Sequence, residues 1–105
     1  MSMKQERINE MCLDVYRKAC EEYFNCESNI KPFCKCTANV CDTSSYFLLR
    51  SYNTIVAVIE KSSGNCYEIL LVAHGYTATI AQHIAKFSND YGNGKRYTWR
   101  EIPHR

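Results

Sequence analysis

Residues 50 to 91 read RSYNTIVAVIEKSSGNCYEILLVAHGYTATIAQHIAKFSNDY, and the rest of the chain is organised around this stretch. It contains two runs rich in aliphatic residues, Ile55 to Glu60 and Cys66 to Ala73, with the turn sequence KSSGN between them at Lys61 to Asn65. Two such runs joined by a Gly- and Ser-rich turn predict a β-hairpin. Because Ile69 to Val72 is apolar without alternation, we expect the second strand of the hairpin to be central and covered on both faces.

A helix is predicted directly after the hairpin, from Thr77 to Tyr91. Its apolar residues recur with the period of one helix face, and they are Ile80, Ile84, Phe87 and Tyr91. Threonine is a favourable N-cap residue and glycine commonly follows the end of a helix. We therefore expect Thr77 or Thr79 to cap this helix and Gly92 or Gly94 to end it.

Two histidines lie next to these elements, His74 at the end of the strand and His83 at the edge of the helical stripe. Such a pair is a candidate for acid/base chemistry or metal binding. No carboxylate is spaced to orient either ring, as a ligand or catalytic histidine needs. We therefore favour the interpretation that each is a border histidine hydrogen-bonded to a backbone group.

Residues 1 to 24 predict a first amphipathic helix that lies on the sheet. Its apolar positions follow one helix face and are Ile8, Met11, Cys12, Val15, Ala19 and Tyr23. The helix also carries acidic groups, which are Glu10, Asp14, Glu21 and Glu22. We interpret Glu10 and Asp14 as solvated charges rather than a catalytic dyad, because nothing nearby predicts a buried site.

Residues 25 to 45 are predicted to form a cysteine-rich loop, because Pro, Asn, Ser and Thr separate the cysteines and Pro32 forbids continuation of the helix. Four thiolates are a suitable ligand set for zinc, and the candidates are Cys26, Cys34, Cys36 and Cys41. Their spacing is irregular for a zinc site, with one C-x-C pair. We favour free thiols that pack as small apolar groups over a zinc site.

The remaining strands flank the hairpin. Tyr46 to Arg50 predicts another strand, so that residues 46–73 are strands and their turns, and the alternating tail predicts a last edge strand at residues 95–102. The basic and aromatic residues of the tail are Lys95, Arg96, Tyr97, Trp99 and Arg100. This pattern suits single-stranded nucleic acid, and it equally suits an edge strand with an aromatic inner face, which we favour. The same residue types are enriched in protein interfaces.

The length, the composition and the predicted elements together indicate one α+β domain over residues 1–105. The 46% apolar and 23% charged composition is that of an ordinary globular protein. The elements predict an N-terminal helix, a small antiparallel sheet of three to four strands that contains the hairpin, a second helix after it and a C-terminal edge strand. The N-terminus is charged and no run approaches the roughly 20 apolar residues of a membrane span, so we expect a soluble protein without an export signal.

The net charge and the number of cysteines limit which classes of function the sequence favours. The net charge of +2 is small, and the basic character lies in residues 92–105, with four basic groups against one acidic group. This is weak support for a nucleic-acid partner. Seven cysteines in a reducing cytosol favour core packing or metal over disulfides. We find no nucleophile, base and orienting group that together predict an enzyme.

Residues 48–92 contain three short motifs in series, which are Ser51-Tyr52-x-Thr54-x-Val56-Ala57-x-Ile59, then Gly75-Tyr76-Thr77-Ala78-Thr79, and then His83-Ile84 with Phe87. With these motifs, this part of the chain resembles a domain of unknown function that is widespread in phages and mobile elements. The pattern of that domain is roughly SYxTxVAxI, then YSxTT, then HIxxF. This chain departs from it at Thr77, where the pattern has Ser, and at Ile80, where a polar residue is usual.

The resemblance implies an origin and a function class. Small cysteine-rich phage proteins without catalytic motifs are often inhibitors of host proteins, and anti-CRISPR proteins are the best-known class. We therefore expect a non-catalytic inhibitor in the cytoplasm of the bacterial host, which binds a CRISPR nuclease of type II (Cas9) or its RNA-bound complex. The acidic groups of the first helix and the basic, aromatic tail are the candidate partner-binding residues. The alternative is a small zinc-binding or basic nucleic-acid-binding regulator, and both a monomer and a homodimer remain open.

Overall fold

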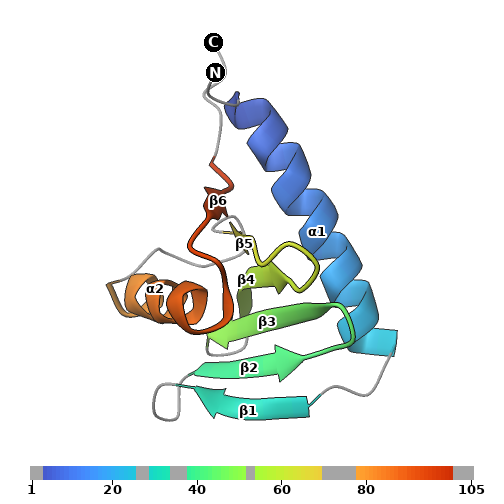
Figure 1. Cartoon of the computed structure of the whole chain (residues 1–105), viewed down its shortest axis with the longest axis vertical. Helices are drawn as coiled ribbons and strands as arrows, with labels where there is room; N and C mark the ends of the chain where they lie inside the picture. Colours follow the sequence, from blue (N-terminus) through green and yellow to red (C-terminus); the bar gives the residue numbers. More distant parts are fainter. Residues whose placement is uncertain (1–3, 26–28, 34–37, 52–53, 70–77, 101–105) are drawn as a thin grey trace.

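The computed structural model describes residues 4–25, 29–33, 38–51, 54–69 and 78–100 (Figure 1). These residues form two helices and one six-stranded sheet, which confirms the predicted α+β class. The elements in chain order are α1 (Gln5–Asn25), β1 (Asn29–Phe33), β2 (Ala38–Asp42), β3 (Tyr46–Ser51), β4 (Thr54–Glu60), β5 (Cys66–Glu68), α2 (Ala78–Tyr91) and β6 (Arg96–Thr98). The strand order in the sheet is the order in the chain.

The predicted hairpin is confirmed, since β4 and β5 pair antiparallel with Val58 opposite Tyr67. The first helix, the strand at Tyr46, the second helix and the C-terminal edge strand are also confirmed. The strand β5 lies inside the sheet between β4 and β6, and residues 66–69 are buried. The rest of the predicted strand, up to Ala73, lies outside the described residues.

The prediction of a loop at residues 25–45 was wrong, because the described part of this segment forms two more strands. β1 and β2 pair antiparallel, with Ile30 opposite Cys41 and Pro32 opposite Asn39. Proline lacks the N–H that a central strand needs, but an edge strand tolerates it, and β1 is the edge strand. The sheet therefore exceeds the expected three to four strands.

The last strand also differs from expectation, because β6 pairs with β5 in parallel. The buried carboxylate of Glu68 holds the two strands together. Its oxygens accept hydrogen bonds from Nε and Nη2 of Arg96 at 2.9 and 3.0 Å, and from the hydroxyl of Thr98 at 3.1 Å. A bidentate arginine–carboxylate pair constrains the relative position of its two groups in addition to stabilising them. This pair therefore sets the register of β6 against β5.

Two apolar clusters lie on opposite faces of the sheet. Alternation along the strands sends Leu48 and Val58 towards α1, and Leu49 and Ile59 towards α2. The predicted apolar stripe of α2 is confirmed at Ile84 and Phe87, whose side chains are fully buried. The side chain of Ile80 and the predicted cap at Thr77 lie outside the described residues, and Thr79 lies inside the helix rather than at its cap.

The end of α2 requires glycine at position 92. The Gly92 amide donates to the carbonyl of Ser88 at 3.0 Å, and a Cβ atom at Gly92 would meet that same oxygen at 2.8 Å. It would also lie 3.1 Å from the carbonyl of Gly64 in the turn between β4 and β5. Gly92 thus allows the helix end and the hairpin turn to approach closely.

Helix α1 covers the outer edge of β6. Figure 1 shows the first half of α1 running beside β6. Gln5 donates to the carbonyl of Thr98 at 2.9 Å, and Asn9 both donates to the carbonyl of Arg100 at 2.7 Å and accepts from its amide at 2.9 Å. These side chains occupy backbone groups that an exposed edge would offer to another strand.

Candidate functional site

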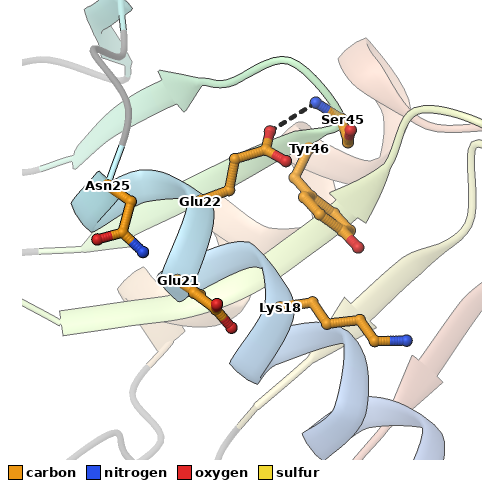
Figure 2. A pocket seen from close by; sticks show the side chains of 6 residues that line it. All are labelled: Lys18, Glu21, Glu22, Asn25, Ser45 and Tyr46. Carbon is orange, nitrogen blue, oxygen red and sulfur yellow. Dashed lines mark hydrogen bonds between the residues drawn. The ribbon is translucent and has the colours of Figure 1, made fainter.

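A polar hollow lies between the last turns of α1 and the turn that joins β2 to β3 (Figure 2). Its volume is about 370 Å³. The residues that line it are Lys18, Glu21, Glu22, Asn25, Ser45 and Tyr46. Two of the predicted partner-binding residues, Glu21 and Glu22, are thus brought together with residues from the start of β3.

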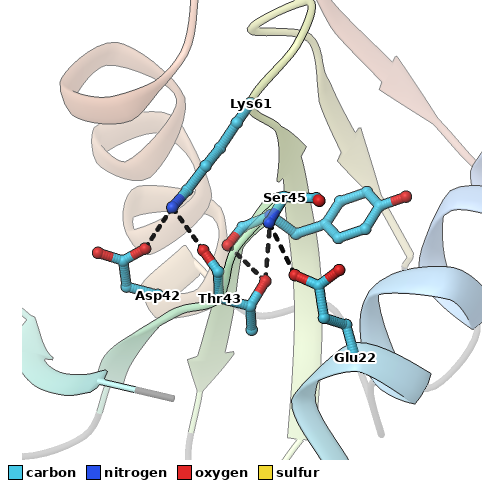
Figure 3. Close-up of polar contacts among 6 residues, drawn as sticks. Glu22, Asp42, Thr43, Ser45 and Lys61 are labelled. Atoms are coloured by element: carbon cyan, nitrogen blue, oxygen red, sulfur yellow. Dashed lines mark hydrogen bonds and ion pairs between the residues drawn. The ribbon is translucent and has the colours of Figure 1, made fainter. Parts of the chain in front are cut away.

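Glu22 fixes the position of the turn relative to the helix. Its carboxylate accepts a hydrogen bond from the amide of Ser45 at 2.7 Å. The Thr43 hydroxyl first, and then hydrogen bonds from Ser45, hold the pKa of the Glu22 carboxyl below its ordinary value. Figure 3 shows the bond from the Ser45 amide. The anionic form of Glu22 is therefore part of the structure rather than a free charge on the surface.

Lys61 holds the same turn from the other side. Its ammonium group pairs with the carboxylate of Asp42 and donates to the carbonyl of Thr43 (Figure 3). Its backbone amide donates to the carbonyl of Ser45 at 2.9 Å. The turn is bound by both α1 and the residue after β4, so the wall of the hollow is held in place by contacts within the protein itself.

Tyr46 and Glu21 give the hollow its chemical character. Figure 2 shows the ring of Tyr46 between the helix and the turn, with its hydroxyl on the side away from Ser45. Burial first, and then the negative charge of Glu60, raise the pKa of Tyr46, so its hydroxyl stays a neutral hydrogen-bond donor and acceptor. Glu21 is exposed at the rim. The described lining includes neither cysteine nor histidine, and it suits binding of a polar or cationic side chain.

The other predicted acidic residues of α1 do not form a continuous negative surface. Asp14 lies 3.0 Å from Lys18 and 3.1 Å from Arg17, and these cations, Lys18 first, lower the pKa of the Asp14 carboxyl. Glu10 lies beside a second hollow of about 460 Å³, lined by Glu10, Leu13, Asp14 and Arg17. Acidic and basic groups alternate along the outer side of α1, so this side is not a mimic of a phosphate backbone.

The predicted tail residues lie along the other half of α1, away from the hollow. Arg96 is paired with Glu68, and the ring of Tyr97 stacks on Tyr67 at 5.4 Å between centroids. Trp99 is half-buried against the cluster under α1. These contacts explain the aromatic and basic pattern as an edge strand with its inner face on the core. Lys95 and Arg100 have exposed side chains.

Of the four candidate zinc ligands, the structure describes only Cys41, because Cys26, Cys34 and Cys36 lie outside the described residues. Cys41 is fully buried in the cluster under α1, and burial raises the pKa of its thiol. Within the described ranges, no three His, Cys, Asp or Glu side chains are grouped for a metal ion. The zinc site therefore stays an untested alternative to the free thiols that the sequence favours.

Three of the described thiols, those of Cys12, Cys41 and Cys66, are core groups, as is His83, whereas Cys20 is half-buried. Burial first, and then Glu68, raise the pKa of Cys12 and of Cys66 to about 12, which keeps both thiols protonated and poorly nucleophilic at neutral pH. His83 is buried, and its Nδ1 lies 3.4 Å from the hydroxyl of Ser51, so its partner is a side chain rather than the expected backbone group. His74 lies outside the described residues.

Sequence reasoning missed Ser45 and Tyr46 as site residues. In the sequence, Tyr46 stands out only as a strand-forming aromatic residue and Ser45 only as part of a loop.

Comparisons with protein-family models, with curated proteins and with solved structures found no match for this chain. Neither helix of the described residues is long and apolar enough to cross a membrane.

Proposed function

We propose that this protein is a non-catalytic inhibitor, of phage or mobile-element origin, that binds a host defence nuclease in the bacterial cytoplasm. The expected target is a type II CRISPR effector (Cas9), which makes the protein an anti-CRISPR protein. The observation that carries the proposal is the polar hollow at the end of α1, which presents Glu21 and Tyr46 on a preformed wall.

The chemistry of the hollow matches the surface of such a target. Nucleases hold their nucleic acids in channels lined by lysine and arginine. An exposed carboxylate at Glu21 pairs with such a cation, and the neutral hydroxyl of Tyr46 accepts or donates a further hydrogen bond. Tyrosine is among the residue types that contribute most to protein interfaces. Because Glu22 and Lys61 already hold the wall, binding costs little ordering of the chain.

A binding role is favoured over catalysis and over nucleic-acid binding by where the reactive groups lie. The described thiols of Cys12 and Cys66 are buried and stay protonated. In the tail, the half-buried ring of Tyr97 stacks on Tyr67 and Arg96 is held by Glu68, so both side chains are engaged by the protein itself rather than by bases or phosphates.

The test is a DNA cleavage assay with a panel of purified CRISPR nucleases, including type II effectors loaded with guide RNA. The protein should block cleavage by at least one effector. Glu21→Lys should weaken inhibition about tenfold, since it replaces an attractive contact with a repulsive one. Tyr46→Phe keeps the ring and removes the hydroxyl, and it should weaken inhibition to a smaller extent.

The matched control is Glu6→Lys, which makes the same charge change on the exposed side of the same helix, outside the hollow. It should inhibit like the unmodified protein. Unaffected cleavage across the whole panel contradicts the proposed function. Equal losses for Glu21→Lys and Glu6→Lys contradict the assignment of the hollow.

A further inference from the structure

Helix α1 has an outer side on which the described structure places nothing. Cys12, Val15 and Ala19 face the sheet and are buried. Figure 1 shows α1 at the margin of the molecule, with no described strand or helix on its far side. The side chain of Leu13 is nevertheless 41% exposed there and that of Phe24 is 77% exposed. These two apolar groups lie eleven residues apart, about 16 Å along the axis, so they are two separate apolar points on one exposed helix side.

The exposed apolar residues belong to one seam along the helix. Positions 10, 13, 17, 20 and 24 are separated by three and four residues in turn, which places them on one side of an α-helix. The seam contains Glu10, Leu13, Arg17 and Phe24, with Cys20 at its margin, where the half-buried thiol packs against the cluster under α1. It differs from the side that carries Lys18 and Glu22, where the polar hollow lies.

The centre of this seam is complementary to itself. Glu10 and Arg17 lie at equal distances along the helix on either side of Leu13 and Asp14, and they are about 10 Å apart along the axis. When two copies of α1 pack antiparallel about a two-fold axis at that centre, Glu10 of each copy faces Arg17 of the other. Leu13 of each copy then lies against the hollow that Glu10, Leu13, Asp14 and Arg17 line.

Asp14 lies as near to this axis along the helix as Leu13 does, and it would lie close to Leu13 of the other copy. It is neutralised within each copy by Lys18 at 3.0 Å and Arg17 at 3.1 Å. The side chain of Arg17 is 75% exposed, so its contact with Asp14 contributes little and leaves the guanidinium free to bridge Asp14 and a second carboxylate. The charges near the axis are therefore balanced.

The sheet edges are poor alternatives for self-association. The edge at β6 is occupied by Gln5 and Asn9. The edge at β1 carries Pro32, which lacks an N–H donor, and two copies paired about Lys31 would set like charges opposite each other. A second copy is thus accommodated by the helix rather than by strand pairing.

We propose that the seam of α1 is a homodimer interface, in which two copies pack antiparallel with Leu13 at the centre and reciprocal Glu10–Arg17 ion pairs on either side. One pair of helices buries less area than the roughly 800 Å² per partner of a standard stable interface. The dimer is therefore weak and forms in a concentration-dependent way. This inference does not depend on the proposed inhibitory function.

Sedimentation velocity over a concentration range from low micromolar to millimolar tests the interface. The unmodified protein should shift from monomer to dimer. Leu13→Glu should remain monomeric. Glu10→Arg and Arg17→Glu should each weaken dimerisation about tenfold, because every substitution acts twice in a two-fold dimer. The double variant Glu10→Arg/Arg17→Glu should restore it, because the reciprocal pairs are rebuilt with their signs exchanged.

The rescue is specific, since Glu10 and Arg17 are too far apart within one helix to pair with each other. Lys95→Glu, an exposed change on β6, is the control and should dimerise normally. Circular dichroism confirms that every variant is folded. A protein that stays monomeric at all concentrations overturns the proposal. Dimerisation that Leu13→Glu leaves unchanged, or that the double variant fails to restore, overturns it as well.

Discussion

Replacing Arg96 with alanine should destabilise the protein by about 3 kcal/mol, because the change leaves the carboxylate of Glu68 buried without its cation. The side chain of Glu68 is 4% exposed and that of Arg96 is 38% exposed. Removing one partner of a fully buried pair costs about 3–5 kcal/mol. The lower end applies here, since Arg96 is partly solvated and the hydroxyl of Thr98 still donates to the carboxylate at 3.1 Å.

The measurement is urea unfolding followed by circular dichroism. With a slope of about 2 kcal/mol per molar urea, the midpoint should fall by about 1.5 M. A double-mutant cycle with Glu68→Gln isolates the pair, because glutamine removes the buried charge. The double variant should cost about 2 kcal/mol less than the sum of the single variants. Lys95→Ala, an exposed neighbour, should change stability by less than about 0.5 kcal/mol.

Strict additivity of Arg96→Ala and Glu68→Gln would refute the reasoning. So would a cost for Arg96→Ala no greater than that of Lys95→Ala. Either result would mean that the register of β6 depends on backbone pairing and on aromatic packing instead of the Glu68 pair.

Three further outcomes are expected. Gly92→Ala should lower the free energy of unfolding by about 1–3 kcal/mol in urea melts, since its Cβ would lie 2.8 Å from the carbonyl of Ser88; a cost below that of Gly94→Ala, where φ is +96° and no atom lies within 4 Å, would contradict the close approach. Stability should fall as pH rises from about 9 towards 12, because the thiols of Cys12 and Cys66, with their pKa raised to about 12, keep their protons in the folded state and lose them in the unfolded state; Cys66→Ala should reduce that slope, and Cys12 should maintain the remainder. Metal analysis should find less than stoichiometric zinc, with no effect of a chelator on thermal melting, because Cys41 is buried in the apolar cluster; stoichiometric zinc would establish the metal site.

The sequence predicts a helix or strand well where its apolar residues form an unbroken face or run. The stripe of α2 follows from burial on one side, and the unbroken apolar run of β4 follows from burial on both faces of the sheet, so their positions could be predicted to within a residue or two. β1 and β2 were missed because Pro32 and Asn39 weaken the strand pattern, and the pairing of Ile30 with Cys41 is a tertiary contact. The parallel pairing of β6 depends on Glu68, which lies 28 residues earlier in the chain.

The candidate site was only partly predictable for a related reason. Glu21 and Glu22 stand out as acidic groups at the end of a predicted helix. Their role depends on Ser45 and Tyr46, which the fold brings to the helix from beyond two strands that sequence reasoning did not find. Of the two acidic groups, the structure uses Glu22 to hold the wall and leaves Glu21 exposed at the rim.

The proposed inhibitory role is tested most directly by measuring binding of the protein to a guide-loaded type II effector with isothermal titration calorimetry. The account predicts saturable binding that weakens about tenfold with Glu21→Lys and stays unchanged with Glu6→Lys. Because the contact is between charges at the rim, binding should also weaken as salt is raised. Absence of binding to every effector in the panel would contradict the account, and so would binding that Glu21→Lys leaves intact.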